Sequence, residues 1–271
     1  MGVRSVIGRL QLSLGRRPWA VAAAVKIRNQ CDMVIQAYLS ERDHAELNGE
    51  KRVIELVAPG AGTFIDVGAN VGDWAELFLA ADGREKRGLL IEPSASAVAR
   101  ARERFRGRAK IRIIHAAVSD SVGEIEFYEE PDAGQTSSVH RSATRPGAQA
   151  HTVRLTTVDQ EAAEAGFEFV DMLKVDAEGY DLHVLRGANR LLSERKIGTI
   201  QFEYNRPWAN SGSTLIAAMN YLKGFGYEVY LLRTGGLQLF DYERYGEFFG
   251  YANFIAVSPA SLPTLRPLIS A

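Results

Sequence analysis

Two short segments combine chemically active side chains with the pattern of a buried strand. In LKVDAEGYD, period-two alternation places Lys174, Asp176 and Glu178 on one side of the chain and apolar residues on the other. In IQFEYN, the same rule places Glu203 and Asn205 on one side. Carboxylates in such positions can accept a proton from a substrate, and an amide can orient one.

Charged side chains on buried strands need a physical reason. Strands of a sheet covered by helices on both faces are normally almost continuously apolar. Unpaired charge inside a protein is costly, so these groups must be paired, hydrogen-bonded or open to a cleft. We expect a cleft at the carboxyl edge of the sheet. The alternative is a structural network, in which Lys174 pairs with Asp176 or Glu203 while Glu178 fixes the start of a helix near Asp181.

The same oxygen atoms would also suit a divalent cation. Asp176, Glu203 and Asn205 are ligands of the type that magnesium accepts. Three oxygen-bearing residues on two strands are only suggestive of a metal site, however. We therefore predict no metal.

A glycine loop lies between the first strand pattern and the first helix pattern of the main domain. In FIDVGANVGDW, Gly68 and Gly72 can take strained dihedrals and let the backbone approach a ligand. The dinucleotide fingerprint is not met, because Asn70 and Asp73 stand where its second and third glycines would fall. An aspartate at the helix start repels a pyrophosphate, so a ligand without phosphate fits better.

An acid closes the second strand pattern, RGLLIEP. Glu92 follows Gly72 by twenty residues, a spacing at which an acid can bind both hydroxyls of a ribose. The loop and this acid together predict an adenosine-containing ligand without phosphates. The alternative is an ordinary tight turn with Glu92 as an exposed acid at a helix start.

The elements that position these residues alternate along the chain. From Val53 onward strand and helix patterns take turns, which indicates a doubly wound, mostly parallel α/β sheet. KIRIIHAAV reads as a third buried strand, and YEVYLL and NFIAVSP lie close enough in sequence to pair antiparallel. We expect an N-terminal helical extension at residues 1–52 and one domain at residues 53–271. The turn-rich residues 131–151 are a candidate substrate lid or an inert surface loop.

Five segments together resemble the FkbM-type family of S-adenosylmethionine-dependent methyltransferases. FIDVGANVGDW, IEPS, HAAVSD, KVDAEGYDLHVLRGA and FEYN follow one another at the expected spacing across residues 64–205. The resemblance implies a seven-stranded, Rossmann-like class I methyltransferase sheet. It also implies that the cofactor, S-adenosyl-L-methionine, lies across the carboxyl ends of the strands, in agreement with the general rule for open α/β sheets.

The resemblance implies roles for individual residues. The expected cofactor-binding residues are Asp66, Gly68, Asn70, Gly72, Glu92, Ala117 and Val118, the last two against the adenine ring. Methyl transfer to a hydroxyl needs a base, for which Asp176 is our first choice and Glu203 the second, with Asn205 orienting the acceptor. The implied acceptor is a small or glycosylated molecule, such as a sugar of a polysaccharide, glycolipid or secondary metabolite.

Two other functions remain open from the sequence. An NAD-dependent oxidoreductase is supported by Glu92 and the alternating elements but opposed by the glycine spacing. A binding protein that keeps the fold without turnover is opposed by the intact set of acids.

Composition excludes some classes of partner. The chain has 271 residues, 46% of them hydrophobic, and a formal net charge of −1, which is typical of a soluble globular protein and argues against nucleic-acid binding. A single cysteine, Cys31, excludes an internal disulfide and is typical of the reducing cytoplasm, where we place the protein.

The first thirty-one residues are basic, with six cationic residues and no acid before Asp32. Their apolar run, PWAVAAAV, is too short to span a bilayer. We expect a helical segment that packs on the domain or on a second subunit in a homodimer. A transit peptide and a peripheral contact with a membrane surface are the alternatives.

Overall fold

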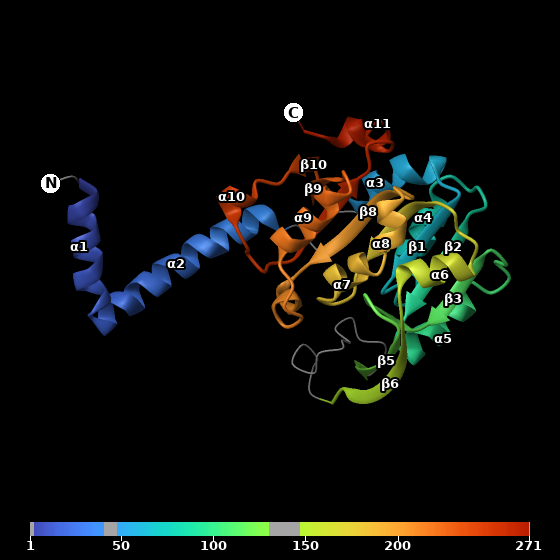
Figure 1. Cartoon of the computed structure of the whole chain (residues 1–271), viewed down its shortest axis with the longest axis horizontal. Helices are drawn as coiled ribbons and strands as arrows, with labels where there is room; N and C mark the ends of the chain where they lie inside the picture. The colour runs from blue at the N-terminus through green and yellow to red at the C-terminus, as the bar shows by residue number, and fades with distance from the viewer. Residues whose placement is uncertain (1–2, 41–47, 130–146, 271) are drawn as a thin grey trace. The chain divides into compact units, whose positions relative to one another are not determined.

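The computed structural model describes residues 3–40, 48–129 and 147–270, which form two compact units (Figure 1). The first unit is Met1–Ser40 and the second is Glu41–Ala271. Two helices make up the first unit, α1 (Val3–Gly15) and α2 (Pro18–Leu39). Within the described ranges, no helix is both long enough and apolar enough to cross a membrane.

The second unit is built on one large sheet of eight strands. In chain order these strands are β1 (Thr63–Val67), β2 (Arg87–Glu92), β3 (Ile111–His115), β7 (Val170–Val175), β8 (Ile197–Tyr204), β9 (Glu228–Arg233), β10 (Gly236–Leu239) and β11 (Ala252–Val257). Across the sheet their order is β10-β9-β11-β8-β7-β1-β2-β3. The predicted α/β fold is therefore confirmed, with eight strands in place of seven.

Strand directions follow the predicted pattern. The strands β3, β2, β1, β7 and β8 run parallel to their neighbours, while β11 runs antiparallel to β8 and to β9. The predicted antiparallel pairing of the last two strand segments is thus confirmed. The additional strand, β10, arises because Gly236 pairs with Arg233 and closes a two-residue hairpin that the sequence reading missed.

A second, three-stranded sheet is inserted after β3. It contains β4 (Ala117–Val118), β5 (Gly123–Glu129) and β6 (Gln149–Thr156) in the order β4-β6-β5. The prediction that KIRIIHAAV forms one buried strand was wrong, because the chain leaves the large sheet after His115. As a result β3 is an edge strand whose residues are only partly buried. Most of the predicted lid, residues 130–146, lies outside the described residues.

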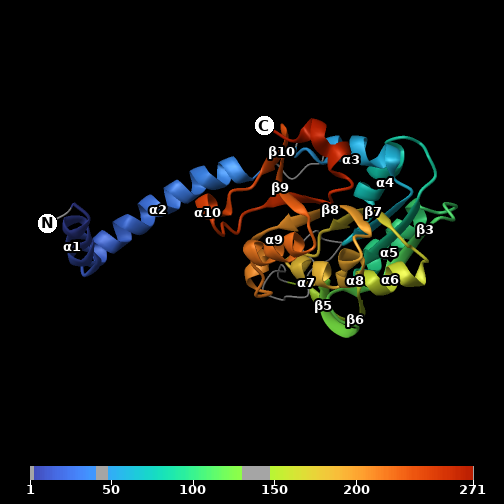
Figure 2. The same cartoon turned by 45° about the horizontal axis from the view of Figure 1, so that its top comes forward.

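Helices cover both faces of the large sheet. They are α3 (Glu50–Val57), η1 (Ala58–Gly60), α4 (Asp73–Ala80), α5 (Ala95–Arg104), α6 (Val158–Glu164), α7 (Asp181–Arg186), α8 (Asn189–Ser193), η3 (Arg206–Ala209), α9 (Leu215–Gly224), α10 (Tyr242–Tyr245), α11 (Leu262–Leu265) and η4 (Arg266–Leu268). Figure 2 shows α3 and α4 on one side of the strands and α7, α8 and α9 on the other.

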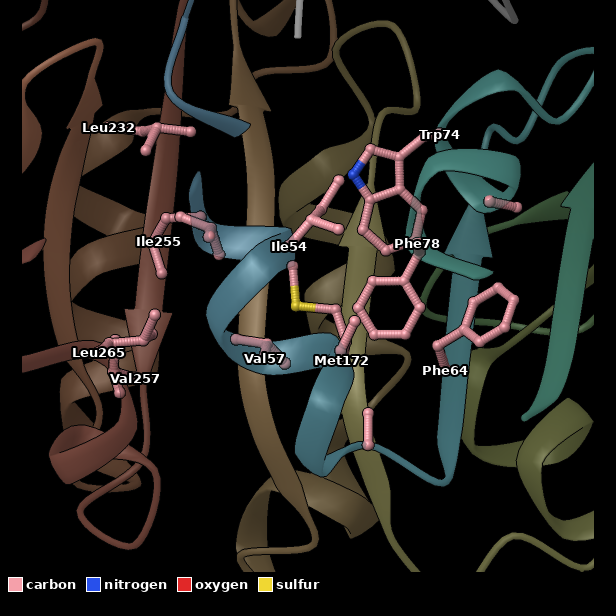
Figure 3. Close-up of a cluster of buried hydrophobic side chains, with 14 of the residues drawn as sticks. Ile54, Val57, Phe64, Trp74, Phe78, Met172, Leu232, Ile255, Val257 and Leu265 are labelled. Carbon is pink, nitrogen blue, oxygen red and sulfur yellow. The ribbon is translucent and has the colours of Figure 1, made fainter. Parts of the chain in front are cut away.

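The helix α3 anchors the start of the second unit. Its Ile54 and Val57 are buried and lie between Ile255 and Met172 of the sheet (Figure 3). Burying an aliphatic side chain of this size stabilises the fold by about 1.5–3 kcal/mol. The predicted division into an extension at residues 1–52 and a domain at residues 53–271 falls inside α3, and the division remains a prediction.

Candidate functional site

A row of polar side chains crosses four neighbouring strands of the large sheet. Asp66 of β1 pairs in register with Lys174 of β7, which pairs with Gln201 of β8. Two residues further along β8, Glu203 lies opposite Asn253 of β11. Because these positions alternate with apolar ones, the row lies on a single face, as the alternation in the sequence predicts.

The cation of this row is paired with two acids. Lys174 Nζ donates a hydrogen bond of 3.0 Å to Asp176 Oδ2 and lies 3.9 Å from Asp66 Oδ1. Burial alone would lower the pKa of Lys174, but the charges of Asp176, Asp66 and Glu50 outweigh it and raise that pKa. Lys174 therefore stays charged. The pair with Asp176 is the contact that the structural alternative expected, and it also holds the Asp176 carboxylate in one orientation.

The two carboxylates beside Lys174 differ in exposure. The side chain of Asp66 is fully buried, whereas 31% of the Asp176 side chain is exposed. Burial raises the pKa of Asp66 to about 7, against the opposing attraction of Lys174. Neither oxygen of Asp66 accepts a hydrogen bond from the described residues. Of the two, Asp176 is the carboxylate that a substrate could reach.

Glu203 and Asn205 form a second polar group. Asn205 Nδ2 donates a hydrogen bond of 2.6 Å to Glu203 Oε1. Burial raises the pKa of Glu203 well above its usual value, and the charges of Asp176 and Glu178 add to that rise. Asn205 Oδ1 is buried and accepts no hydrogen bond within the described part of the chain. Asp176, Glu203 and Asn205 are thus held at the same edge, where Asn205 still has an acceptor to offer.

Glu50 belongs to the same polar cluster but was not predicted. Gln201 Nε2 donates a hydrogen bond to Glu50 Oε1, and Glu50 N donates to Asn48 Oδ1 at 3.0 Å. Burial raises the pKa of Glu50, while Lys174 opposes the rise. The surrounding segment, GEKRVIEL, reads as an exposed charged helix start, so the sequence offers no sign that this acid is buried.

The glycine loop packs against the segment that carries Asp176. A Cβ atom added to Gly68 would lie 1.8 Å from the carbonyl oxygen of Asp176, and one added to Gly72 would lie 2.4 Å from the Phe105 ring. Both glycines have positive φ, and Asn70 between them has a φ of 47°. These glycines therefore let the chain pack on itself, and this packing brings the loop and Asp176 together.

Glu92 is held by the backbone on both of its oxygens. Asn70 N donates to Glu92 Oε2 at 2.9 Å and Ser94 N donates to Oε1 at 2.8 Å. Burial raises the pKa of Glu92 to about 7, although these two hydrogen bonds oppose the rise. Each carboxylate oxygen can accept a further hydrogen bond, so the orientation suits a ligand with two hydroxyls.

Ala117 and Val118 are buried in the small sheet. Ala117 packs with Phe127 and Val153, and the preceding residue, Ala116, donates its N–H to the Glu92 carbonyl at 3.1 Å. This bond places the start of β4 beside Glu92. The expected contact of Ala117 and Val118 with an adenine ring remains a prediction.

Asp181 is a second acid that the sequence reading did not single out as buried. It is the first residue of α7 and is fully buried. Burial raises its pKa to about 8, with a contribution from Asp176. The backbone N–H groups of Asp181 itself, Ala177 and Gly179 point toward the Asp181 carboxylate and oppose the rise in its pKa. Among the described residues, none of them lies in hydrogen-bonding geometry with that carboxylate.

No metal centre is evident in the part of the chain that the structure describes. Within residues 3–40, 48–129 and 147–270, no group of three or more His, Cys, Asp or Glu side chains could hold a metal ion. The absence of a catalytic metal remains a prediction.

Comparison with known proteins identifies relatives of this chain. The family model described as the methyltransferase FkbM domain matches residues 66–229. The 2-O-methyltransferase NoeI of Sinorhizobium fredii is 25% identical over 175 residues, which cover 59% of this chain and 70% of NoeI. The AMB antimetabolite synthetase AmbE of Pseudomonas aeruginosa is 26% identical over 240 residues, which cover 74% of this chain but only 11% of AmbE.

A solved structure is also similar to this chain. The crystal structure of the methyltransferase FkbM from Methylobacillus flagellatus KT is 15% identical, with a TM-score of 0.48. The match covers 72% of this chain and 43% of that one.

The family match spans more than half of the chain and includes the residues of the site. Residues 66–229 contain the glycine loop, Glu92, Asp176, Glu203 and Asn205. The match confirms the resemblance seen in the sequence and favours a methyltransferase over an oxidoreductase. The chain belongs to the FkbM methyltransferase family.

Proposed function

We propose that this protein is an S-adenosylmethionine-dependent O-methyltransferase that acts on a hydroxyl of a small or glycosylated acceptor. The observation that carries the proposal is the position of Asp176. It is partly exposed at the carboxyl edge of the sheet, held by Lys174, and in backbone contact with Gly68 of the glycine loop. The 2-O-methyltransferase activity of NoeI supports oxygen as the acceptor atom.

The charges of the site suit a cationic cofactor without phosphate. Asp66 and Asp176 lie beside the cation Lys174, and Lys174 also acts on the pKa of Glu203. The pKa of Glu92 is raised in part by the charges of Asp176 and Asp66. S-adenosylmethionine carries a sulfonium and an ammonium group, whereas NAD carries an anionic pyrophosphate that these acids would repel. When bound, this cofactor supplies an electrophilic methyl group.

Several residues would hold the cofactor. The unpartnered oxygens of Asp66 and the free acceptor capacity of Glu92 fit a ligand rich in N–H and O–H donors. We assign the ribose hydroxyls to Glu92, the neighbouring backbone to Gly68, Asn70 and Gly72, and the adenine to Ala117 and Val118.

The remaining polar residues would act on the acceptor. Asp176 accepts the hydroxyl proton, and the hydrogen bond from Lys174 orients its carboxylate. Glu203, whose pKa is raised, can carry a proton and donate a hydrogen bond to the acceptor. Asn205 contributes its unpartnered Oδ1 as an acceptor for a second hydroxyl. Such positioning is what methyl transfer to an oxygen requires.

The acceptor class rests on family resemblance. We propose a sugar of a polysaccharide, glycolipid or secondary metabolite, and a cytoplasmic reaction.

Calorimetry with S-adenosylhomocysteine and with NAD tests the cofactor, and labelled S-adenosylmethionine with extracts of the source cell tests transfer. Binding of S-adenosylhomocysteine with transfer to a hydroxyl supports the proposal. Binding without transfer to any metabolite or glycan would favour a non-catalytic binding protein.

A further inference from the structure

The first unit exposes much of the apolar surface of this protein. Of sixteen large hydrophobic side chains that are exposed among the residues with described side chains, twelve belong to α1 and α2. In α1, Ile7, Leu10 and Leu14 follow one another at intervals of three and four residues, so they share one face of the helix. Arg9 falls outside this face. The helix α1 therefore has an apolar face that is exposed, with Leu12 as an exposed apolar residue outside that face.

The apolar surface of α2 is broad. Ile27 and Val34, seven residues apart, share one side of the helix, while Val25 and Met33 project from other sides and are also exposed. Trp19, near its start, is 65% exposed. A single partner helix would bury a seam of the a and d type, which is narrower than the exposed apolar surface of α2. A lipid surface can cover a broad apolar face, with a tryptophan at its boundary.

The net charge of this unit favours a lipid surface over a second copy of the chain as the partner that covers its apolar side chains. Residues 1–40 contain six cationic residues and one acid, Asp32, which gives a net charge of +5. Arg28 is paired with Asp32, the single acid of this unit, at 3.7 Å. Two copies of this unit would repel one another, whereas an anionic bilayer would attract it.

We propose that α1 and α2 bind the surface of an anionic lipid bilayer. The apolar face of α1 and the Trp19 ring enter the boundary between headgroups and acyl chains, and the cationic side chains lie among the phosphates. This interaction does not depend on methyl transfer. Cofactor binding by the second unit can therefore be measured separately.

Trp19 can serve as the fluorescent probe of vesicle binding. The other two tryptophans, Trp74 and Trp208, are buried, so a change of environment on vesicle binding reports on Trp19. We would titrate the full chain with vesicles of phosphatidylcholine alone and with vesicles containing one-third phosphatidylglycerol. We expect a blue shift with the anionic vesicles, affinity at least about tenfold higher than for neutral ones, and weakening by salt. Trp19→Phe should remove the shift but not the co-sedimentation.

A charge introduced on the apolar face tests the mode of binding. The double variant Leu10→Asp with Leu14→Asp should lower vesicle affinity at least about tenfold. Leu239→Asp is the matched control, because Leu239 is 68% exposed in β10 of the second unit, and it should bind as the wild type does.

Three results would overturn the proposal. The chain could fail to bind either kind of vesicle, or the double variant could bind as the wild type does. Light scattering could also show a dimer that the double substitution dissociates, with no response to vesicles. That last result would assign the apolar face to a second copy of the chain.

Discussion

Asp176 follows directly after the buried strand β7. Its carboxylate is partly exposed and forms an ion pair with Lys174. Asp66 also lies beside Lys174, but its side chain is fully buried, whereas 31% of the Asp176 side chain is exposed. Burial raises the pKa of Asp66 to about 7. The partly exposed one, Asp176, is the carboxylate that we propose as the base.

Replacing Asp176 by Asn should remove the base and leave the fold intact. We expect the methyl-transfer rate to fall by about 10²–10⁴-fold, with cofactor affinity nearly unchanged. The matched control is Asp171→Asn at the other end of β7, where the carboxylate accepts hydrogen bonds from Gly62 N and Thr63 N. That variant should lose about 1–3 kcal/mol of stability but keep its rate. Single-turnover kinetics and thermal unfolding separate the two effects, and wild-type turnover by a folded Asp176→Asn would refute the assignment.

Buried acids should make the cofactor-free protein less stable as pH rises. Asp66 and Glu92 have a pKa of about 7 and Asp181 of about 8, so the native state still binds protons that the unfolded state has released above about pH 4.5. Their contribution is fully present below the unfolded pKa values and is lost as pH rises through 7 to 8. The melting temperature should therefore decrease between pH 5.5 and 8.5.

The variant Asp181→Asn isolates one of these groups. An amide does not ionise, so the fall in unfolding free energy should become shallower by up to about 1.4 kcal/mol per pH unit. Denaturant unfolding at several pH values measures this slope. An unchanged slope would show that the Asp181 carboxyl is not held in its neutral form.

At the scale of elements, the contact of the glycine loop with the end of β7 joins the proposed cofactor region to the proposed base. Two of the four non-glycine residues with positive φ among the described residues, Asn70 and Glu178, lie in these two turns. Left-handed conformations at non-glycine residues are costly and often occur at functional sites. The turns that follow β1 and β7 are therefore in backbone contact, and each holds a residue in the left-handed region.

The variant Gly68→Ala tests this contact. The new Cβ atom would clash with the Asp176 carbonyl at 1.8 Å, so we expect a loss of at least about 3 kcal/mol of stability together with reduced turnover. Gly83→Ala is the matched control, because Gly83 has a similar φ of 67° and no atom within 4 Å of the added Cβ. It should cost only about 1–2 kcal/mol, the penalty for a left-handed alanine. Equal costs for the two variants in urea unfolding would contradict the packing argument.

Local patterns in the sequence predict the elements well where period and spacing carry the information. The alternation in LKVDAEGYD and FEYN located Lys174, Asp176, Glu203 and Asn205, because a period of two fixes the face of a strand. The burial of Glu50 could not be predicted, since it depends on Gln201, 151 residues away along the chain. Similarly, the passage of the chain into the small sheet after His115 depends on pairing with β6, which is distant in sequence.

At the scale of the whole molecule, the chain consists of a basic, apolar helical unit and an enzyme-like unit whose core includes α3. The predicted division at residue 52 cuts α3, whereas the division between the two units follows Ser40. Each unit carries a separate proposed activity, binding of lipid by the first and methyl transfer by the second.

Two shortened chains should therefore differ. A chain that begins at residue 41 should bind the cofactor as the full chain does and lose vesicle binding. A chain that begins at residue 53 should melt at a lower temperature, because it lacks Glu50 and its hydrogen bond with Gln201. Equal melting temperatures for the two shortened chains would show that the polar contacts of α3 do not stabilise the second unit.

Transfer of labelled methyl groups tests the central claim most directly. With labelled S-adenosylmethionine and acceptor extracts, the wild-type protein should place label on a hydroxyl oxygen. Asp176→Asn should bind S-adenosylhomocysteine with wild-type affinity in calorimetry and transfer almost none. Binding of NAD in place of S-adenosylhomocysteine, or label on nitrogen or carbon alone, would contradict the proposed O-methyltransferase.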